Sequence, residues 1–271
     1  MALWDEPGGL SIEAIRRHLW GDTFACHLYL FNEVSSTNTV LARLAREGAR
    51  EGTVVIAESQ TAARARLGKR WFSPWGVNLY ISLLLRPAIP LRALPGFSFI
   101  ASLALCDTIR QSNVMATIKW PNDVVVGRRK IAGVLAQCGT RGDAVDYVVL
   151  GMGVNLNVTR EMLEHALGDE APLATSLANE TEQEVDRNLF VATLLNMLEK
   201  WLNVYRTRGA QAVLYAWHER DALAGRKVSV HGDSLHDTGW VVGLSPDGHL
   251  IFEDVKGESH ELLTGEIRLL R

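Results

Sequence analysis

A β-hairpin is predicted by residues 118–137, Ile118-Lys-Trp-Pro-Asn-Asp-Val-Val-Val-Gly-Arg-Arg-Lys-Ile-Ala-Gly-Val-Leu-Ala-Gln137. An apolar, β-branched run from Val124 to Val126 leads into a turn at Gly127. A second apolar strand, from Ile131 to Leu135, follows at hairpin distance. Two strands joined by a tight turn give a stiff support to the side chains at their ends.

Charged and polar side chains stand at the mouth of this hairpin. Lys119 precedes the first strand and Lys130 begins the second, while Asn122 and Asp123 follow Pro121, whose fixed φ stiffens the approach. Two ammonium groups, an amide and a carboxylate on a rigid hairpin suit a small anionic or phosphorylated ligand. An ordinary hairpin with solvated charges at its ends fits these residues equally well.

A basic segment lies upstream, in a region without acidic residues between Ser59 and Cys106. Four cations lie close together there: Arg64, Arg66, Lys69 and Arg70. Small residues and a lack of apolar periodicity predict a mobile loop between two strands, Thr53–Ala57 and Asn78–Leu85. Such a loop can close over phosphates or a carboxylate. A solvated basic loop and a nucleic-acid patch are the alternatives, and the net charge of -3 disfavours the second.

Five blocks of the sequence carry a resemblance to a known family: Ser36-Thr-Asn38, Trp71-Phe-Ser-Pro-Trp-Gly-Val-Asn-Leu79, Lys119-Trp-Pro-Asn-Asp123, Arg129-Lys-Ile-Ala-Gly133 and Gly151-Met-Gly-Val-Asn155. In this order the chain resembles the biotin–protein ligases (biotin–[acetyl-CoA-carboxylase] ligases) over nearly its whole length. The resemblance implies an α+β fold, a class II aminoacyl-tRNA-synthetase-like catalytic domain followed by a small SH3-like β-barrel. It also implies a two-step enzyme. Biotin and MgATP form biotinyl-5′-AMP and pyrophosphate, and biotin then passes to one lysine of a biotin carboxyl carrier protein domain.

The same resemblance implies roles for individual residues. The implied biotin-binding residues are Ser36, Thr37, Asn38, Gln60, Arg64, Ala65, Arg66, Trp71, Lys130 and Gly133. The implied ATP-binding residues are Lys119, Asn122 and Asn155, and the implied catalytic residues are Lys130, Arg66 and Asp123. Asp123 is a candidate to hold Mg²⁺, to orient the basic loop or to assist the attacking lysine, and the sequence leaves these open. A lone Ser-Thr-Asn would by default be a plain helix N-cap.

The basic loop departs from the family pattern, Gly-Arg-Gly-Arg-x-Gly-Arg. Alanines stand at Ala63 and Ala65 where the family has glycine, and Lys69 stands where it has arginine. Alanine pays about 1 kcal/mol or more wherever glycine adopts a positive φ. Either this loop uses only conformations that are open to alanine, or it closes less tightly over the adenylate, and the second alternative is the expectation to be tested. At the C-terminus the family arginine that faces the nucleotide is displaced by one position, so that role is not transferred to Arg271.

The chain is predicted to divide near residue 225, into a catalytic domain (1–224) and an SH3-like domain (225–271). The expected helices are Ser11–Leu19, Asn38–Glu47, Gly96–Ser112, Glu184–Arg208 and Ala210–Ala224, and Tyr147–Asn157 is an expected strand. The expected strands of the second domain are Lys227–Val230, Thr238–Leu244, Leu250–Asp254, Ser259–Leu263 and Glu266–Leu269. Residues 160–176 are expected to form a second flexible loop over the nucleotide.

Composition bounds the class of protein. The chain has 271 residues, of which 47% are hydrophobic and 22% charged, as in globular proteins. Its apolar stretches look too short to span a bilayer, so no membrane partner is expected. Cys26, Cys106 and Cys138 form no even framework and predict buried free thiols in a reducing compartment, which favours the cytoplasm. The histidines show no metal-ligand spacing.

The N-terminus bears on DNA binding. Some family members carry a winged-helix domain, and residues 1–35 are roughly half of what that module requires. We therefore expect a ligase of the short form, without DNA as a partner, whose state as monomer or homodimer stays open. Two other functions remain: a lipoate or octanoate–protein ligase of the same fold, and a catalytically weak adenylate-binding protein.

Overall fold

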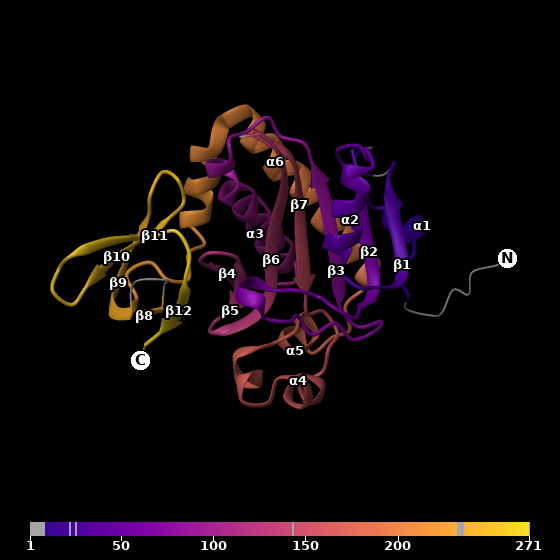
Figure 1. Cartoon of the computed structure of the whole chain (residues 1–271). Helices are drawn as coiled ribbons and strands as arrows, with labels where there is room; N and C mark the ends of the chain where they lie inside the picture. Colours follow the sequence, from indigo (N-terminus) through magenta and orange to yellow (C-terminus); the bar gives the residue numbers. More distant parts are fainter. Residues whose placement is uncertain (1–8, 22, 25, 143, 232–235, 271) are drawn as a thin grey trace.

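The computed structural model of the chain describes residues 9–270, apart from residues 22, 25, 143 and 232–235 (Figure 1). Its large sheet contains β1 (Leu28–Val34), β2 (Val54–Gln60), β3 (Leu79–Leu85), β4 (Ala116–Lys119), β5 (Asp123–Val126), β6 (Arg129–Arg141) and β7 (Ala144–Val154). The strand order is β1-β2-β3-β7-β6-β5-β4. The β1–β2 pair is parallel, and the other neighbours in this sheet are antiparallel, so the sheet is mixed.

Helices cover both faces of this sheet. They are α1 (Ile12–Arg16), α2 (Thr37–Arg46), α3 (Pro95–Arg110), α4 (Arg160–Leu167), α5 (Leu177–Thr181) and α6 (Arg187–His218), with short 3-10 turns η1 (Arg66–Gly68), η2 (Leu91–Ala93) and η3 (Gly168–Leu173). Neighbouring residues of a strand point to opposite faces. Val54 and Ile56 accordingly join the core under α3 and α6, while Val55 packs in a smaller cluster with Leu41 of α2. The alternation of side chains along the strands thus gives two cores, one on each face of the sheet.

The predicted hairpin forms as β5 and β6. Val126 pairs with Arg129 across the turn, and Gly127 has φ +60°, a conformation that glycine adopts without steric cost. β6 runs further than expected, to Arg141, because its residues Ala132–Arg141 pair with β7. The hairpin therefore lies between β7 and the edge strand β4, and pairing on both sides holds its charged mouth rigidly.

The two helices expected over Glu184–Arg208 and Ala210–Ala224 form as α6 with a break at Gly209 (φ +78°), which confirms the division. Their outer bounds differ, because α6 begins at Arg187 and ends at His218, six residues before the expected Ala224. The segment Leu91–Arg110 is long and apolar enough, by length and composition, to cross a membrane. The expectation that no stretch reaches this length was wrong. Most of this segment is buried in the fold, where α3 packs against the sheet and α6, so core packing accounts for its composition.

A buried ion pair ties the N-terminal segment to the large sheet. Glu58 of β2 lies 2.6 Å from the Nη1 atom of Arg187, the first residue of α6, and both side chains are almost fully buried. The backbone N–H of Leu10 also donates to Glu58 (2.8 Å). Burying these charges is tolerated because each meets a hydrogen-bonded partner. The pair fixes the start of α6 against the end of β2.

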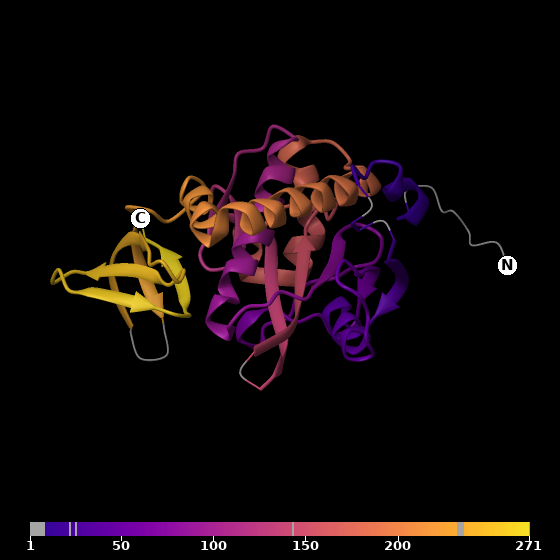
Figure 2. The same ribbon diagram turned by 90° about the horizontal axis from the view of Figure 1, so that it is seen from above.

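The C-terminal part is a five-stranded antiparallel sheet formed by β8 (Lys227–His231), β9 (His236–Leu244), β10 (Leu250–Asp254), β11 (Ser259–Leu262) and β12 (Glu266–Leu269). Its order is β11-β10-β9-β8-β12, as in the expected SH3-like barrel, which lies beside the C-terminal part of α6 (Figure 2). Among the described residues no ladder joins β11 to β12, so closure there is left to the loop between them. The Trp120 indole N–H donates to the carbonyl of Gly248 (3.1 Å) and docks the barrel on the part of the molecule that contains the large sheet.

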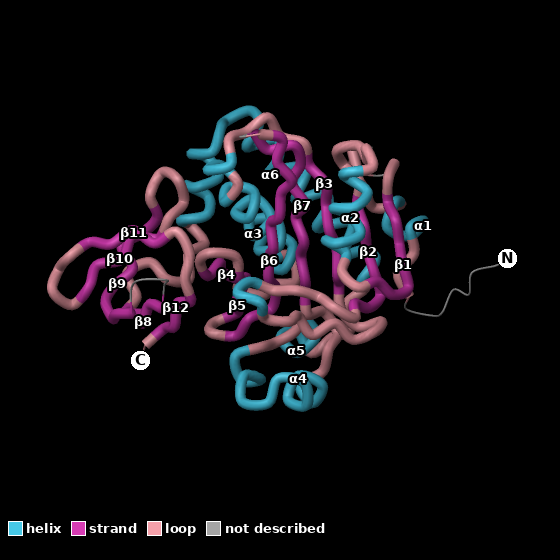
Figure 3. Tube along the Cα trace, viewed as in Figure 1, coloured by secondary structure: helices cyan, strands magenta, loops and turns pink. Residues whose placement is uncertain are grey.

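The cysteine and loop predictions were partly wrong. Cys106 is buried, Cys138 is half-buried and Cys26 is exposed, because Cys26 lies in a turn before β1 rather than in an element. Residues 160–176, expected as a flexible loop, form the helical segments α4 and η3 (Figure 3). Thr159 caps α4 by accepting the N–H of Met162, a local signal the sequence contained. Arg271 lies outside the described residues.

Candidate functional site

All the predicted site residues except Asn155 line one pocket of about 180 Å³: Ser36, Thr37, Asn38, Gln60, Arg64, Ala65, Arg66, Trp71, Lys119, Asn122, Asp123, Lys130 and Gly133. The pocket lies on the face of the sheet that α2 covers. It extends from the start of α2, across β6 and β7, to the basic loop (residues 63–70). Segments far apart in the sequence therefore meet in one place.

One end of the pocket is polar and buried. We call it the polar end, formed by Ser36, Thr37, Asn38, Gln60 and Ser82. The Thr37 backbone N–H donates to the Gln60 side-chain oxygen (2.9 Å). The Ser82 hydroxyl donates to the Asn38 Oδ1 atom (2.7 Å), and the Asn38 amide donates to the carbonyl of Leu135 (3.2 Å). Satisfied hydrogen bonds in a buried network hold side chains in one orientation. The polar end is therefore built before any ligand arrives.

Two glycines of β7 make room for the side chains of the pocket. A Cβ at Gly151 would lie 2.0 Å from the Asn38 Oδ1 atom. A Cβ at Gly153 would lie 2.6 Å from the Trp71 ring. Any larger residue at either position would displace these side chains, since real Cβ atoms do not approach so closely. The glycines of the Gly151-Met-Gly153 block are thus required by packing in the pocket.

The charged centre of the pocket brings three cations around one carboxylate. The Lys130 Nζ atom lies 2.6 Å from Asp123 Oδ1 and 5.3 Å from the centre of the Trp71 ring. Burial lowers the pKa of Lys119, and the Asp123 carboxylate raises it in part. Burial likewise lowers the pKa of Arg66, again opposed by Asp123. Partly desolvated cations interact strongly with an anionic ligand because water screens them less.

The basic loop is joined to the barrel by side-chain contacts. The Arg66 guanidinium donates to Thr264 Oγ1 (2.6 Å), in the turn between β11 and β12, and to Asn122 Oδ1 (3.3 Å). Lys69 forms an ion pair with Glu266 (3.5 Å). Arg64 is exposed and pairs through its backbone with Arg70. Arg66 is thus the residue of this loop that touches both parts of the molecule.

The backbone strain expected at the two alanines of the basic loop lies instead at Leu67. Ala65 has φ -108° and ψ -179°, ordinary extended backbone, and Ala63 is absent from the described residues with positive φ. Leu67 has φ +55°, in the left-handed region, and its side chain is 64% exposed. An L-residue pays about 1–2 kcal/mol in that region. The alanines therefore fit this loop, and Leu67 carries the strained backbone.

A second chamber of about 740 Å³ opens on the other side of the charged centre, and Lys119, Asp123 and Lys130 line both spaces. Residues of α4 and η3 form its far wall. Asn155 lines this chamber and not the first pocket. Its side-chain amide donates to the carbonyl of Thr175 (2.9 Å), which anchors the segment leading to α5. The volume of the chamber lies in the range of sites that hold small molecules and cofactors.

The residues near Asp123 do not form a protein-built magnesium site. Two carboxylates line the pocket, and each is engaged by a cation: Asp123 by Lys130 and Glu266 by Lys69. Magnesium prefers octahedral oxygen coordination and is often held largely by substrate phosphates. We therefore treat Mg²⁺ as part of the nucleotide substrate and assign it no residue.

Some residues of the site were missed by the sequence analysis. Ser82 is fully buried and was detectable, because it is the one small polar residue in the strand Leu79–Leu85, whose other members are aliphatic or aromatic. Thr264 and Glu266 reach the basic loop from a distant part of the chain, and no local pattern marks that contact. Contacts between residues far apart in the chain produce no periodic pattern in the sequence.

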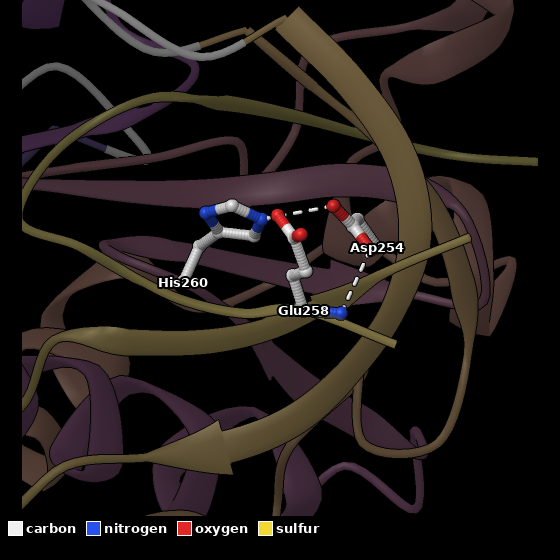
Figure 4. A group of neighbouring side chains, drawn as sticks. All are labelled: Asp254, Glu258 and His260. Carbon is white, nitrogen blue, oxygen red and sulfur yellow. Dashed lines mark hydrogen bonds and ion pairs between the residues drawn. The ribbon is translucent and has the colours of Figure 1, made fainter. Parts of the chain in front are cut away.

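A group of potential metal ligands lies elsewhere, in the barrel: Asp254, Glu258 and His260 (Figure 4). Asp254 accepts the backbone N–H groups of Lys256 (2.8 Å) and Glu258 (2.9 Å) and lies 3.1 Å from the His260 Nε2 atom. The hydrogen bond from His260 holds the pKa of Asp254 below its usual value. These bonds close the turn between β10 and β11, which explains the cluster as a structural feature.

Comparisons with known proteins agree with the geometry. Residues 30–155 match the model of the biotin/lipoate A/B protein ligase family. The chain is 32% identical over 255 residues to the bifunctional ligase/repressor BirA of Bacillus subtilis, covering 93% of this chain and 77% of that protein. It is 32% identical over 225 residues to the biotin–[acetyl-CoA-carboxylase] ligase of Paracoccus denitrificans, covering 82% of this chain and 92% of that protein.

A solved structure extends the likeness to the fold. The biotin protein ligase from Aquifex aeolicus in complex with biotin and ATP superposes with a TM-score of 0.73 at 27% identity, covering 91% of this chain and 99% of that one. The sequence blocks that first indicated a family lie around one pocket, and relatives at this identity span most of the chain. The protein belongs to the biotin–protein ligases of the biotin/lipoate A/B protein ligase family.

Proposed function

We propose that this chain activates biotin with ATP and transfers it to a lysine of a biotin carboxyl carrier protein domain. In the first step a carboxylate oxygen of biotin attacks the α-phosphorus of ATP, and pyrophosphate leaves. In the second step the lysine amine attacks the acyl carbon, AMP leaves, and an amide forms with loss of a proton. The observation that carries the proposal is the charged centre, where Lys119, Lys130 and Arg66 surround Asp123 between a small pocket and a larger chamber.

The small pocket suits biotin. A ureido ring presents donors and an acceptor together, and the polar end offers both from Asn38, Gln60 and Ser36. Trp71 walls the middle of the pocket with an apolar ring, where the sulfur ring and alkyl chain of biotin would lie. We assign the carboxylate of biotin to the cationic end, toward Arg66 and Lys130.

Adenylation forces two anionic groups together, so the protein's task is alignment and charge stabilisation. Lys130 stands on β6, a central strand, and its ammonium group is held by Asp123 and the Trp71 ring. We assign it to the bridge between the biotin carboxylate and the α-phosphate. Lys119 and Asn122 stand beside it toward the nucleotide chamber, and we assign them to the phosphates.

Asp123 has a second use in the transfer step. An attacking lysine must be a neutral amine, and it must lose a proton once the amide has formed. In the resting protein the Asp123 carboxylate is paired with Lys130. When Lys130 turns to the phosphate, Asp123 becomes the carboxylate nearest to the reacting atoms, and we assign it to receive or orient that proton. We further propose that the reaction takes place in the cytoplasm, because the chain's cysteines are free thiols, as in a reducing compartment.

Biotin-dependent exchange of pyrophosphate into ATP tests this function. The reaction reports the first step alone and needs no carrier protein. We expect exchange with biotin and none above background with lipoate or octanoate. An acid that lacks a ureido ring would leave the hydrogen-bonding groups of the polar end without partners. Exchange that follows lipoate or octanoate rather than biotin would assign the chain to the other branch of its family. Binding of ATP without exchange would leave an adenylate-binding protein.

A further inference from the structure

Ser82 of β3 lies behind the polar end of the pocket and joins two of its residues. The Ser82 side chain is fully buried and is not among those that line the pocket. Its hydroxyl oxygen lies 2.7 Å from Asn38 Oδ1 and 2.8 Å from Thr37 Oγ1. Gly151 pairs with Ser82 across the sheet and, having no side chain, leaves the room that Asn38 occupies. One buried hydroxyl therefore connects two residues of the pocket lining.

The orientation of the Asn38 amide decides where the Ser82 proton goes. The backbone carbonyl of Leu135 can only accept, so the Asn38 side-chain nitrogen, 3.2 Å away, must face it. The same nitrogen also donates to Gln137 Oε1 (2.9 Å). Asn38 Oδ1 consequently faces Ser82 and requires a donor there, because a buried acceptor without a partner is costly. The single hydroxyl proton of Ser82 is therefore directed to Asn38.

The Thr37 hydroxyl is fixed in turn. Because the Ser82 proton is already used, the 2.8 Å contact between the two hydroxyl oxygens requires the proton of Thr37. The longer contact between Thr37 Oγ1 and Gln60 Oε1 (3.3 Å) requires none, since that amide oxygen already accepts the Thr37 backbone N–H (2.9 Å). Thr37 Oγ1 thus keeps only lone pairs for a ligand, from which it can accept a hydrogen bond but to which it cannot donate one.

The Gln60 amide is fixed in the opposite sense. Its oxygen is held by the Thr37 backbone, and its nitrogen donates to Ser73 Oγ (3.2 Å), whose own hydroxyl donates to the carbonyl of Trp71 (3.1 Å). The amide nitrogen carries two protons, so one N–H of Gln60 remains for a ligand. The polar end therefore presents an acceptor and a donor whose roles cannot be exchanged.

We propose that Ser82 is a positioning residue that determines specificity, because it makes Thr37 an obligate acceptor and so selects a head group that presents an N–H. This inference rests on the proposed function, since it explains how the ureido ring of biotin is selected. Ser82 acts through Thr37 and Asn38 and touches no substrate. A ring with oxygen in place of that N–H would set lone pairs against lone pairs at Thr37 and would be rejected. Without Ser82, the Thr37 proton is free to turn toward such a ring.

Two analogues of biotin separate this role from a merely structural one. In each analogue one ureido N–H is replaced by oxygen, which gives a cyclic carbamate of nearly the same shape. The wild type should prefer biotin over at least one of them by roughly 100-fold or more in the kcat/KM of pyrophosphate exchange. Ser82→Ala should lower that preference by roughly ten-fold. It should also raise the KM for biotin by roughly ten-fold, while kcat and the KM for ATP stay within about two-fold.

Two further variants complete the test. Ser102→Ala is the matched control, because Ser102 is a fully buried serine of α3 whose hydroxyl has no hydrogen-bond partner among the described residues. It should change neither the preference nor the KM for biotin by more than about two-fold. Ser82→Cys keeps a weaker donor in nearly the same volume and should show an intermediate preference. It decides the question if Ser82→Ala does not fold.

The preference between biotin and the carbamates is the decisive quantity. Wild-type preference in a folded Ser82→Ala protein would overturn the proposal even if the KM for biotin rises, because that rise would then report packing alone. A wild type that uses both carbamates as well as biotin would overturn it too. Absent exchange with biotin in the wild type would instead refute the proposed function.

Discussion

The two ends of the reaction pocket are built in opposite ways. At the polar end, Thr37 and Asn38 are buried and hydrogen-bonded to three strands of the sheet. At the other end, the basic loop is mostly exposed, and side chains on a separate domain hold it. We therefore propose that the polar end recognises its ligand with a preformed surface, whereas the basic loop completes the site only when the barrel is docked against it. Specificity and retention of the intermediate are in this way assigned to different parts of the chain.

The largest effect is expected at Lys130, which stands on the rigid strand between these two ends. Lys130→Ala should lower biotin-dependent pyrophosphate exchange by at least ~100-fold, about 2.7 kcal/mol, because a positioned charge in a dry site is worth that much. Arg141→Ala, an exposed cation at the far end of β6 that lines neither the pocket nor the chamber, is the control. Exchange near the wild-type rate in a folded Lys130→Ala protein would show that strand-borne charge does not drive the first step.

Breaking the polar end is expected to come next. Gly151→Ala would place a methyl group against the Asn38 Oδ1 atom. Overpacking costs about 1–3 kcal/mol, so the KM for biotin should rise roughly ten-fold or more. Gly96→Ala, on α3 with open space around its Cβ, is the matched control. The KM for ATP, measured in the same series, should change far less. A rise confined to ATP would contradict the preformed polar end.

A smaller effect is expected where the loop backbone is strained. Leu67→Gly removes the cost of a positive φ, so the closed loop should be more populated and biotinyl-5′-AMP should escape about two- to five-fold more slowly. The double variant Ala63→Gly, Ala65→Gly should not slow escape, because neither alanine has a positive φ. Release of adenylate to solution is the measurement. Slower escape from the double variant alone would place the strain in the alanines after all.

The smallest effect concerns the ion pair between Lys69 and Glu266. The Lys69 side chain is exposed and that of Glu266 is partly exposed, and ion pairs at the surface contribute about 0.2–1 kcal/mol. Glu266→Gln should therefore speed adenylate escape by at most about five-fold at low ionic strength. The difference should vanish near about 0.5 M salt, where exposed charges are screened. Glu253→Gln, an exposed carboxylate elsewhere on the barrel, should have no effect at either salt concentration.

The contrast between a locally built region and one held by distant contacts also explains what the sequence could predict. The hairpin of β5 and β6 was predictable because its turn, its β-branched strands and its charged ends are all local. The break in α6 at Gly209 was predictable for the same reason. The helices α4 and η3 were missed because polar residues and Pro172 masked a short helical segment with a capping threonine.

The site was predictable residue by residue through family blocks, but its connections were not. Membership of the pocket follows from strand registers that bring Gly133 opposite Gly153 and Leu135 opposite Gly151. The link from Arg66 to Thr264 spans 198 positions and two domains, and it depends on how the barrel docks. The strain at Leu67 was likewise not predictable, because the backbone conformation of an irregular loop depends on how its two ends are held and not on its composition.

Arg66 gives the molecule a reciprocal coupling between domain position and ligand retention. The Arg66 guanidinium contacts the barrel and belongs to the basic loop, which we propose closes on the intermediate. Whatever ligand strengthens loop closure must, by thermodynamic linkage, change the orientation preferred by the barrel by the same free energy. A protein that binds the barrel therefore changes how tightly the intermediate is held, without contacting it. Binding of that protein and opening of the basic loop are then coupled steps of one equilibrium.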